Sequence, residues 1–95
     1  MRIDGIIWLE AIVEKLESKH HVATAEVEEV LGVRPGFRFV ERGHRAGENV
    51  YAAFGRTRSG RRLLVFFVYQ PRTHEALIVS AREPTQRERR LYEKK

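Results

Sequence analysis

The chain has 95 residues, of which 42% are hydrophobic, and this size predicts a single folded domain over residues 1–95. No apolar run approaches the roughly 20 residues that a membrane span needs. Asp4 and Glu10 interrupt the N-terminal apolar residues, which does not suit a secretory signal. The absence of cysteine excludes disulfides and cysteine nucleophiles and fits a reducing compartment, so the expected location is cytoplasmic, with no membrane partner.

Basic residues are concentrated in the C-terminal part of the chain. The formal net charge is +5, but residues 1–55 carry seven Lys or Arg against nine Asp or Glu, whereas residues 56–95 carry eleven against four. Nine of those eleven are arginines, which bind phosphate with paired hydrogen bonds and stack on bases. This charge pattern fits two alternatives about equally well: binding of an anionic partner, or a basic surface whose arginines only contact solvent.

The N-terminal third predicts two helices. Residues 1–5 form a short lead-in that could be an edge strand. Apolar residues then recur at helical spacing and would share one helix face: Ile6, Leu9, Val13, Leu16 and His20. A second short helix is predicted from Thr24, its N-cap, to Leu31, with Gly32 ending it.

The middle of the chain predicts four strands joined by short turns. They cover residues 37–41, 49–57, 61–70 and 75–82. The apolar run LLVFFV places the third strand centrally, and the aliphatic run 76–79 predicts a fourth strand packed on both faces. The expected fold is an α+β domain in which the helices pack on one face of a four-stranded antiparallel sheet.

A C-terminal helix completes the expected fold, with two N-terminal helices before the sheet and this one after it. Pro84 stops the fourth strand, and Thr85 and Glu88 have the spacing of a capping box, in which each side chain binds the backbone N–H of the other residue. The helix is predicted from Thr85 to about Glu93. It has little apolar surface and should be only weakly held.

The histidines do not form a metal-binding pattern. His20 and His21 are adjacent, so on a helix they point about 100° apart. His44 and His74 lie in predicted loops without a carboxylate at ligand spacing, so no metal or other cofactor is expected. The glycine-containing segment 55–60 lacks the lysine and following helix of a phosphate-binding loop, which favours a hairpin turn.

The remaining candidates are acid–base and phosphate-binding groups. Histidine titrates near neutral pH, so His20 could be a general acid or base, although its place on the apolar helix face also fits a hydrogen-bonded core histidine. Lys19 borders that face and could reach solvent. Arg56, Arg61 and Arg82 lie at predicted strand ends, where they could cluster around a phosphodiester.

Glu88 and Tyr92 each have two interpretations. The capping box explains Glu88 fully, so a catalytic role would be an addition. Tyr92 could stack on a base or could simply pin the last helix onto the sheet.

The C-terminal sequence VSAREPTQRERRLYE resembles the signature of the BrnT family of toxins. Lys19-His20, followed by a short acidic helix, is similar to the lysine–histidine step that follows the family's first helix. Trp8 stands at the matching distance upstream, and the hairpin of residues 55–65 resembles the middle of the family. The resemblance covers roughly residues 6–93.

The resemblance implies a RelE-like fold and a metal-independent ribonuclease toxin of a type II toxin–antitoxin system. The implied partners are an RNA substrate and a BrnA-like antitoxin with a ribbon–helix–helix region, and a homodimer and a toxin–antitoxin heterotetramer are both left open. In the implied reaction a ribose 2′-oxygen attacks the adjacent phosphate. The implied catalytic residues are Lys19, His20, Arg82 and Glu83. The expected RNA-binding residues are Arg56, Arg61, Arg72 and Tyr92.

In this scheme His20 or Glu83 moves protons, while Lys19 and Arg82 stabilise the transition state. Which of His20 and Glu83 acts as the base stays open.

Several positions depart from the family pattern. Leu9 stands where the family commonly has an acidic residue, Ile12 where it has lysine and Leu16 where it has asparagine. His21 replaces a common glycine, and Val50 and Leu77 replace common arginines. Two interpretations follow. The chain is a divergent active toxin that binds phosphate through Arg56, Arg61 or Arg72, or it is a catalytically inactive relative that binds an antitoxin-like protein or RNA.

Overall fold

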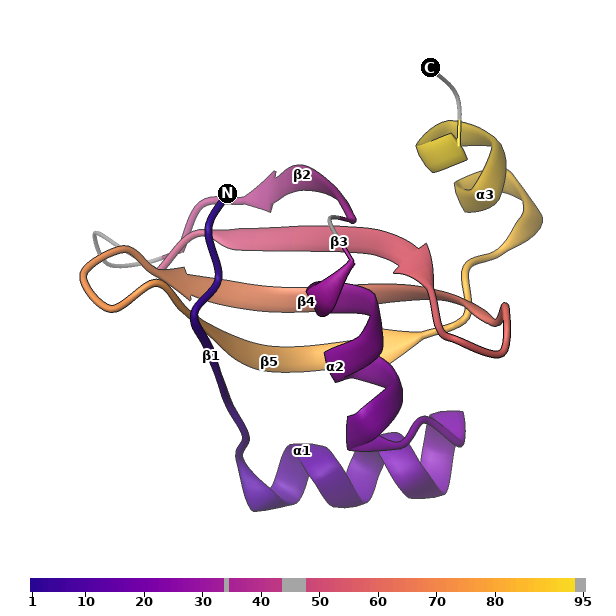
Figure 1. Ribbon diagram of the computed structural model, residues 1–95, viewed down its shortest axis with the longest axis horizontal. Coiled ribbons are helices and arrows are strands. Elements are labelled where there is room, and N and C mark those ends of the chain that lie inside the picture. Colours follow the sequence, from indigo (N-terminus) through magenta and orange to yellow (C-terminus); the bar gives the residue numbers. More distant parts are fainter. Residues whose placement is uncertain (34, 44–47, 94–95) are drawn as a thin grey trace.

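The computed structural model describes residues 1–33, 35–43 and 48–93. It is an α+β fold that combines helices with one twisted sheet (Figure 1). In chain order the elements are β1 (Gly5–Ile7), α1 (Glu10–Lys15), the π-helical turn η1 (Leu16–His20), α2 (Thr24–Gly32), β2 (Gly36–Glu41), β3 (Val50–Arg56), β4 (Arg62–Gln70), β5 (Glu75–Arg82) and α3 (Gln86–Glu93). No helix in the described ranges is long and apolar enough to cross a bilayer.

The sheet has five strands in the order β1-β5-β4-β3-β2, and β1 runs parallel to β5 while the other pairs are antiparallel. The expected four-stranded antiparallel sheet is therefore wrong in its strand number and in its purely antiparallel pairing. Ile6, which the helical spacing assigned to the first helix, instead pairs with Ala76, and Ile7 pairs with Leu77. A three-residue edge strand is too short to show its own period, and β-branched residues suit it well.

The first helix accordingly begins later than predicted, at Glu10, with Leu9 as its N-cap. Leu9 is 50% exposed, so it does not belong to the buried helix face that the spacing indicated. Leu16, by contrast, is 1% exposed and packs into the core, as expected.

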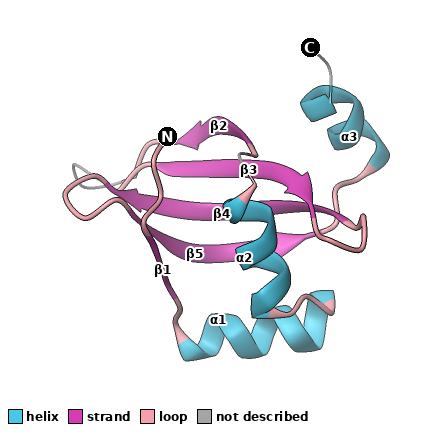
Figure 2. Ribbon diagram, in the orientation of Figure 1, coloured by secondary structure: helices cyan, strands magenta, loops and turns pink. Residues whose placement is uncertain are grey.

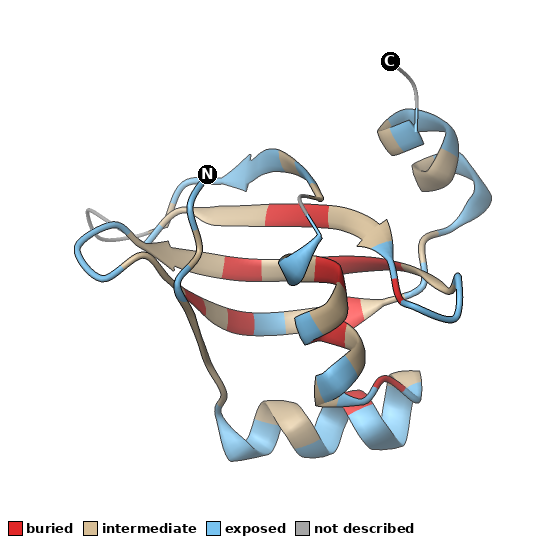
Figure 3. Ribbon diagram, in the orientation of Figure 1, coloured by how far each residue is buried: buried red, intermediate tan, exposed pale blue. Residues whose placement is uncertain are grey.

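The four later strands and the central place of β4 confirm the sequence prediction, since β4 lies between β3 and β5. Buried segments gather along these central strands (Figure 3). We call the side covered by α1, η1 and α2 the first face. Its core joins helix residues to strand residues: Leu16, Val22, Val27, Val30, Ala53, Leu63, Val65, Phe67, Ala76, Ile78 and Ala81.

The prediction that residues 76–79 are packed on both faces is wrong at Val79. The register between β4 and β5 shifts at this point, because Phe66 lies opposite Ser80 and Phe67 lies opposite Ile78. Val79 is the extra residue in this bulge and is 40% exposed.

α3 lies on the opposite side of the sheet, which we call the second face. Leu64 is directly opposite both Phe54 and Arg82, and opposed residues point to the same face. Tyr92 stacks on Phe54 and Glu88 binds Arg82, so α3 covers this face near its end. Figure 2 shows α3 apart from α1 and α2. The expectation that all helices pack on one face is therefore wrong for α3, whose few apolar residues do not specify a side.

The capping box of α3 confirms the prediction. The Glu88 N–H donates to the Thr85 hydroxyl at 3.1 Å, and the Thr85 N–H donates to the Glu88 carboxylate at 2.9 Å. At α2 the N-cap is Ala23, one residue before the predicted Thr24. The Ala23 N–H donates to the Glu26 carboxylate at 3.0 Å, so Glu26 supplies the carboxylate half of a capping box, while alanine has no hydroxyl for the other half.

The first helix ends in a left-handed residue. His21 has φ 53° and ψ 42°, and the Val22 N–H closes the turn on the Leu16 carbonyl at 3.0 Å. This geometry favours glycine, because a side chain in the left-handed region costs roughly 1–2 kcal/mol.

Replacing His21 by glycine is therefore expected to raise the free energy of unfolding, by about 0.5–1 kcal/mol once the greater freedom of glycine in the unfolded chain is allowed for. Urea unfolding of the two proteins measures this change. Replacement by valine, whose branched side chain tolerates this conformation least, should destabilise the protein; equal stability of all three would contradict the account.

Candidate active site

Three predicted arginines mark one end of the sheet. β3 ends at Arg56, Arg61 precedes β4, and β5 ends at Arg82. Because these strands are antiparallel neighbours, the three positions share one end, as the sequence predicts. Arg72 lies in the exposed turn between β4 and β5, at the opposite end of the sheet, so the structure does not bring it together with the others.

Arg61 is the centre of the largest polar cluster at this end. Its Nε–H donates to Glu83 Oε2 at 2.8 Å, and Nη1 donates to Glu26 Oε1 at 2.9 Å. Its Nη1 and Nη2 also donate to the carbonyls of His21 and His20, at 2.8 Å and 3.2 Å. The guanidinium thus binds two carboxylates and the carbonyls at the C-terminal end of the first helix, which have no helical partners.

The charge of Arg61 is firmly retained. Partial burial lowers its pKa, but the hydrogen bonds with Glu83 and Glu26 outweigh that effect and raise the pKa overall. Four of its N–H groups are occupied by the contacts above. The guanidinium therefore serves first as a link between the helix end, α2 and the segment after β5.

The lysine–histidine step lies beside this link. Lys19 is exposed and His20 is half-buried at the end of η1, where Arg61 binds the His20 carbonyl. The Glu83 side chain is 63% exposed and meets Arg61 through one carboxylate oxygen only. Arg61 therefore joins Glu83 to the backbone of the lysine–histidine step at the first-face edge of the sheet.

Arg82 occupies the second face, on the other side of the same strand end. Its Nη1 and Nη2 donate to the two carboxylate oxygens of Glu88 at 2.6 Å and 2.8 Å. The guanidinium carbon also lies 5.4 Å from the ring centroid of Phe66. This two-bond pairing, which the sequence did not predict, ties α3 to β5 and offsets the charge of Arg82.

Glu88 is strongly stabilised as a carboxylate. The hydrogen bonds from Arg82, followed by the backbone N–H of Thr85, hold the pKa of Glu88 at about 2, well below its usual value of 4.5. A carboxylate whose pKa falls on folding contributes stability above its unfolded pKa and loses it as the pH drops.

Acidification is therefore expected to remove the contribution of Glu88 between about pH 4.5 and about pH 2. Because both side chains are partly exposed, we expect this contribution to be only about 1–2 kcal/mol. Urea unfolding at about pH 6 and about pH 3 tests it: Glu88→Gln should lose less stability between the two conditions than the wild type does. The same loss in both proteins would contradict the assignment.

Tyr92 packs against the sheet. Its ring stacks on Phe54 with centroids 5.7 Å apart and an interplanar angle of 26°, and the Arg38 guanidinium lies 5.4 Å from its centroid. Of the two interpretations of this residue, the geometry favours the one in which Tyr92 pins α3. Arg56 is exposed beside it.

An apolar row crosses the second face at the positions where the sequence departs from the expected arginines. Val50 lies opposite Val68, and Val68 lies opposite Leu77. All three are half-buried and share the face of Arg82. They bring no charge to the site.

Glu26 is the site residue that the sequence analysis missed. It lies in the first turn of α2, and its carboxylate binds Arg61. The signal that could have found it is its place three residues after the N-cap, where a glutamate turns back towards the helix start.

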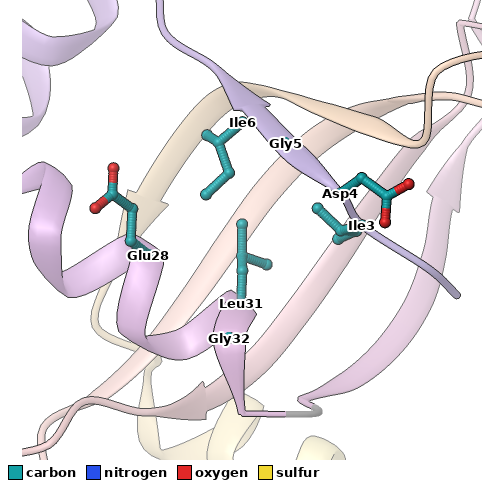
Figure 4. Close-up of a pocket in the computed structure, with 7 residues that line it drawn as sticks. All are labelled: Ile3, Asp4, Gly5, Ile6, Glu28, Leu31 and Gly32. Carbon is teal, nitrogen blue, oxygen red and sulfur yellow. The ribbon is translucent and has the colours of Figure 1, made fainter.

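A separate hollow of about 270 Å³ opens between β1 and the C-terminal half of α2 (Figure 4). Ile3, Ile6 and Leu31 supply its apolar lining, with Asp4 and Glu28 at its rim. None of the predicted site residues lines it. Within the described ranges, no group of three or more His, Asp or Glu side chains is arranged to hold a metal ion.

The architecture is thus that of an α+β protein with a five-stranded mixed sheet and an arginine–glutamate cluster at one strand end. Its fold is similar to the 1.1 Å crystal structure of the Brucella abortus ribonuclease toxin BrnT, with a TM-score of 0.59 and 20% sequence identity. The match covers 86% of this chain and 97% of that chain, so the chain has a BrnT-like fold. No protein-family model and no curated protein sequence matches it.

Proposed function

We propose that the protein is a metal-independent ribonuclease toxin of a type II toxin–antitoxin pair. The observation that carries the proposal is that Arg61 binds both the Glu83 carboxylate and the backbone carbonyl of His20, the second residue of the lysine–histidine step. The BrnT-like fold supports it, because the similar crystal structure is that of a ribonuclease toxin.

Glu83 is the general base in this proposal. Arg61 binds its Oε2 at 2.8 Å, which leaves Oε1 available to a substrate on an exposed side chain. Oε1 takes the proton of a ribose 2′-hydroxyl while the 2′-oxygen bonds to the adjacent phosphorus. The bond from phosphorus to the 5′-oxygen breaks, and that oxygen takes a proton from protonated His20. The products are a 2′,3′-cyclic phosphate and a 5′-hydroxyl.

Two cations stabilise the charge that develops on the phosphate. Lys19 is exposed next to His20 and approaches from the helix end. Arg82 approaches from the other side of β5, where its Nη groups bind Glu88. Among the described residues, none accepts a hydrogen bond from the Arg82 Nε–H, so this donor faces the substrate in the proposal. Glu88 holds the Arg82 guanidinium in place, and a donor fixed before the reaction stabilises the transition state without having to reorganise during it.

The proposed protein partner is a BrnA-like antitoxin with a ribbon–helix–helix region. Support comes from the charge of the C-terminal part of the chain, where eleven basic residues outnumber four acidic ones. An acidic antitoxin surface would complement that charge, in a complex that weakens as salt concentration rises.

The proposal predicts cleavage of RNA by the purified protein in the presence of a metal chelator. The measurement is the chemistry of the product ends, read by mass spectrometry of a cleaved oligoribonucleotide. Cyclic phosphate and 5′-hydroxyl ends are expected, and a substrate with a single 2′-deoxyribose at the cleaved position should resist. Cleavage that stops with the chelator, or that leaves 5′-phosphate ends, would contradict the mechanism.

A second function is a binding module without catalysis. Two observations favour it: Glu88 offsets the charge of Arg82, and the row of Val50, Val68 and Leu77 makes the same face apolar. This alternative predicts no cleavage by the wild type, together with a complex with an antitoxin-like protein or RNA that weakens with salt.

A further inference from the structure

We infer that Glu26 is a positioning residue of the proposed active site, which acts through Arg61 on Glu83 and on the lysine–histidine step. The inference rests on the proposed function and extends it to a residue in α2. Glu26 itself is separated from the proposed base by the Arg61 guanidinium, so it does not act on the substrate.

Glu26 is fixed by its own helix. Its Oε1 accepts both the Ala23 N–H at 3.0 Å and the Arg61 Nη1–H at 2.9 Å. The side chain is 24% exposed, so solvent competes only partly for these bonds. The carboxylate is thus an anchored acceptor at the start of α2, with its position set by backbone.

Arg61 is held at its backbone as well as at its guanidinium. Its N–H donates to the hydroxyl of the buried Thr57, and its carbonyl accepts the Thr57 N–H at 2.9 Å. With the backbone fixed by this turn and Nη1 fixed by Glu26, the Nε–H is aimed at Glu83. The same guanidinium holds the His20 and His21 carbonyls.

The exposed Glu83 depends on this arrangement for its orientation. Arg61 Nε is the one described side-chain donor that binds its carboxylate. Without Glu26 the Nη1 group loses one of its two acceptors, and the guanidinium can turn towards solvent. Catalysis is sensitive to such a change, because a displacement of about 1 Å can reduce a rate on the order of 100-fold.

The test compares three variants of the full chain in steady-state RNA cleavage. Glu26→Ala is expected to lower kcat about 10–100-fold while KM stays within about twofold, since the substrate does not contact Glu26. Glu26→Gln keeps an oxygen that can accept both hydrogen bonds and should restore most of kcat. Glu28→Ala, an exposed position on the same helix, is the matched control and should behave as the wild type.

A second readout follows the arginine itself. In a ¹⁵N-labelled protein the Arg61 Nε–H signal, assigned by its loss in Arg61→Lys, should shift or broaden in Glu26→Ala but not in Glu28→Ala. Cleavage by wild type and Glu26→Ala with equal kcat, or an unchanged Arg61 signal, would overturn the inference alone. A wild type that cleaves no RNA would overturn the proposed function and the inference with it.

Discussion

Replacing Arg61 by glutamine is expected to lower the free energy of unfolding by about 2–3 kcal/mol. The change removes the donor to Glu26 and Glu83 and to two carbonyls at the helix end. A buried pair that loses one partner can cost more, but Glu83 is largely exposed and regains water, which limits the loss.

Urea unfolding at neutral pH measures this loss. The matched control is Arg58→Gln, an exposed arginine in the same turn, which should change the stability by less than about 0.5 kcal/mol. If Arg61→Gln is no less stable than this control, the cluster does not link the helix end to the sheet.

Replacing Glu83 by glutamine is expected to reduce the rate of RNA cleavage about 10²–10⁴-fold, the usual contribution of a general base. Glutamine keeps the shape and the oxygen that accepts the Arg61 Nε–H, but it cannot take a proton. Because the ion pair is exposed, the variant should lose no more than about 1 kcal/mol of stability.

The control for Glu83 is Glu93→Gln. Glu93 also pairs with an arginine, Arg62, but it lies on α3 outside the Arg61 cluster. It should retain wild-type cleavage. Full activity in Glu83→Gln would remove Glu83 from the role of base and leave that role to His20.

The local signals in the sequence predicted much of the fold. The four later strands, the central β4 and the α3 capping box depend on period, β-propensity and side-chain spacing within one segment, so they could be predicted from that segment alone. The bounds of β1 could not be predicted in this way: residues 1–5 were a possible edge strand, but Ile6 also fits a helix period and belongs to a strand only through pairing with β5.

The sequence predicted where the site arginines lie, but it did not predict which carboxylates pair with them. The arginines at strand ends follow from where the strands stop. Whether such an arginine is available to a ligand depends on the carboxylate that meets it across the fold: Glu26 and Glu83 for Arg61, and Glu88 for Arg82. Glu26 and Arg61 are 35 positions apart, and the spacing of neighbouring residues cannot predict a contact between residues so far apart in the sequence.

The most direct test of the central claim is induced expression of the wild type and Glu83→Gln in cells, with growth and total RNA followed together. A ribonuclease toxin predicts that the wild type arrests growth and loses RNA, while Glu83→Gln accumulates as folded protein and does neither. Continued growth with intact RNA, in cells that contain folded wild-type protein, would contradict the ribonuclease assignment and favour the binding module.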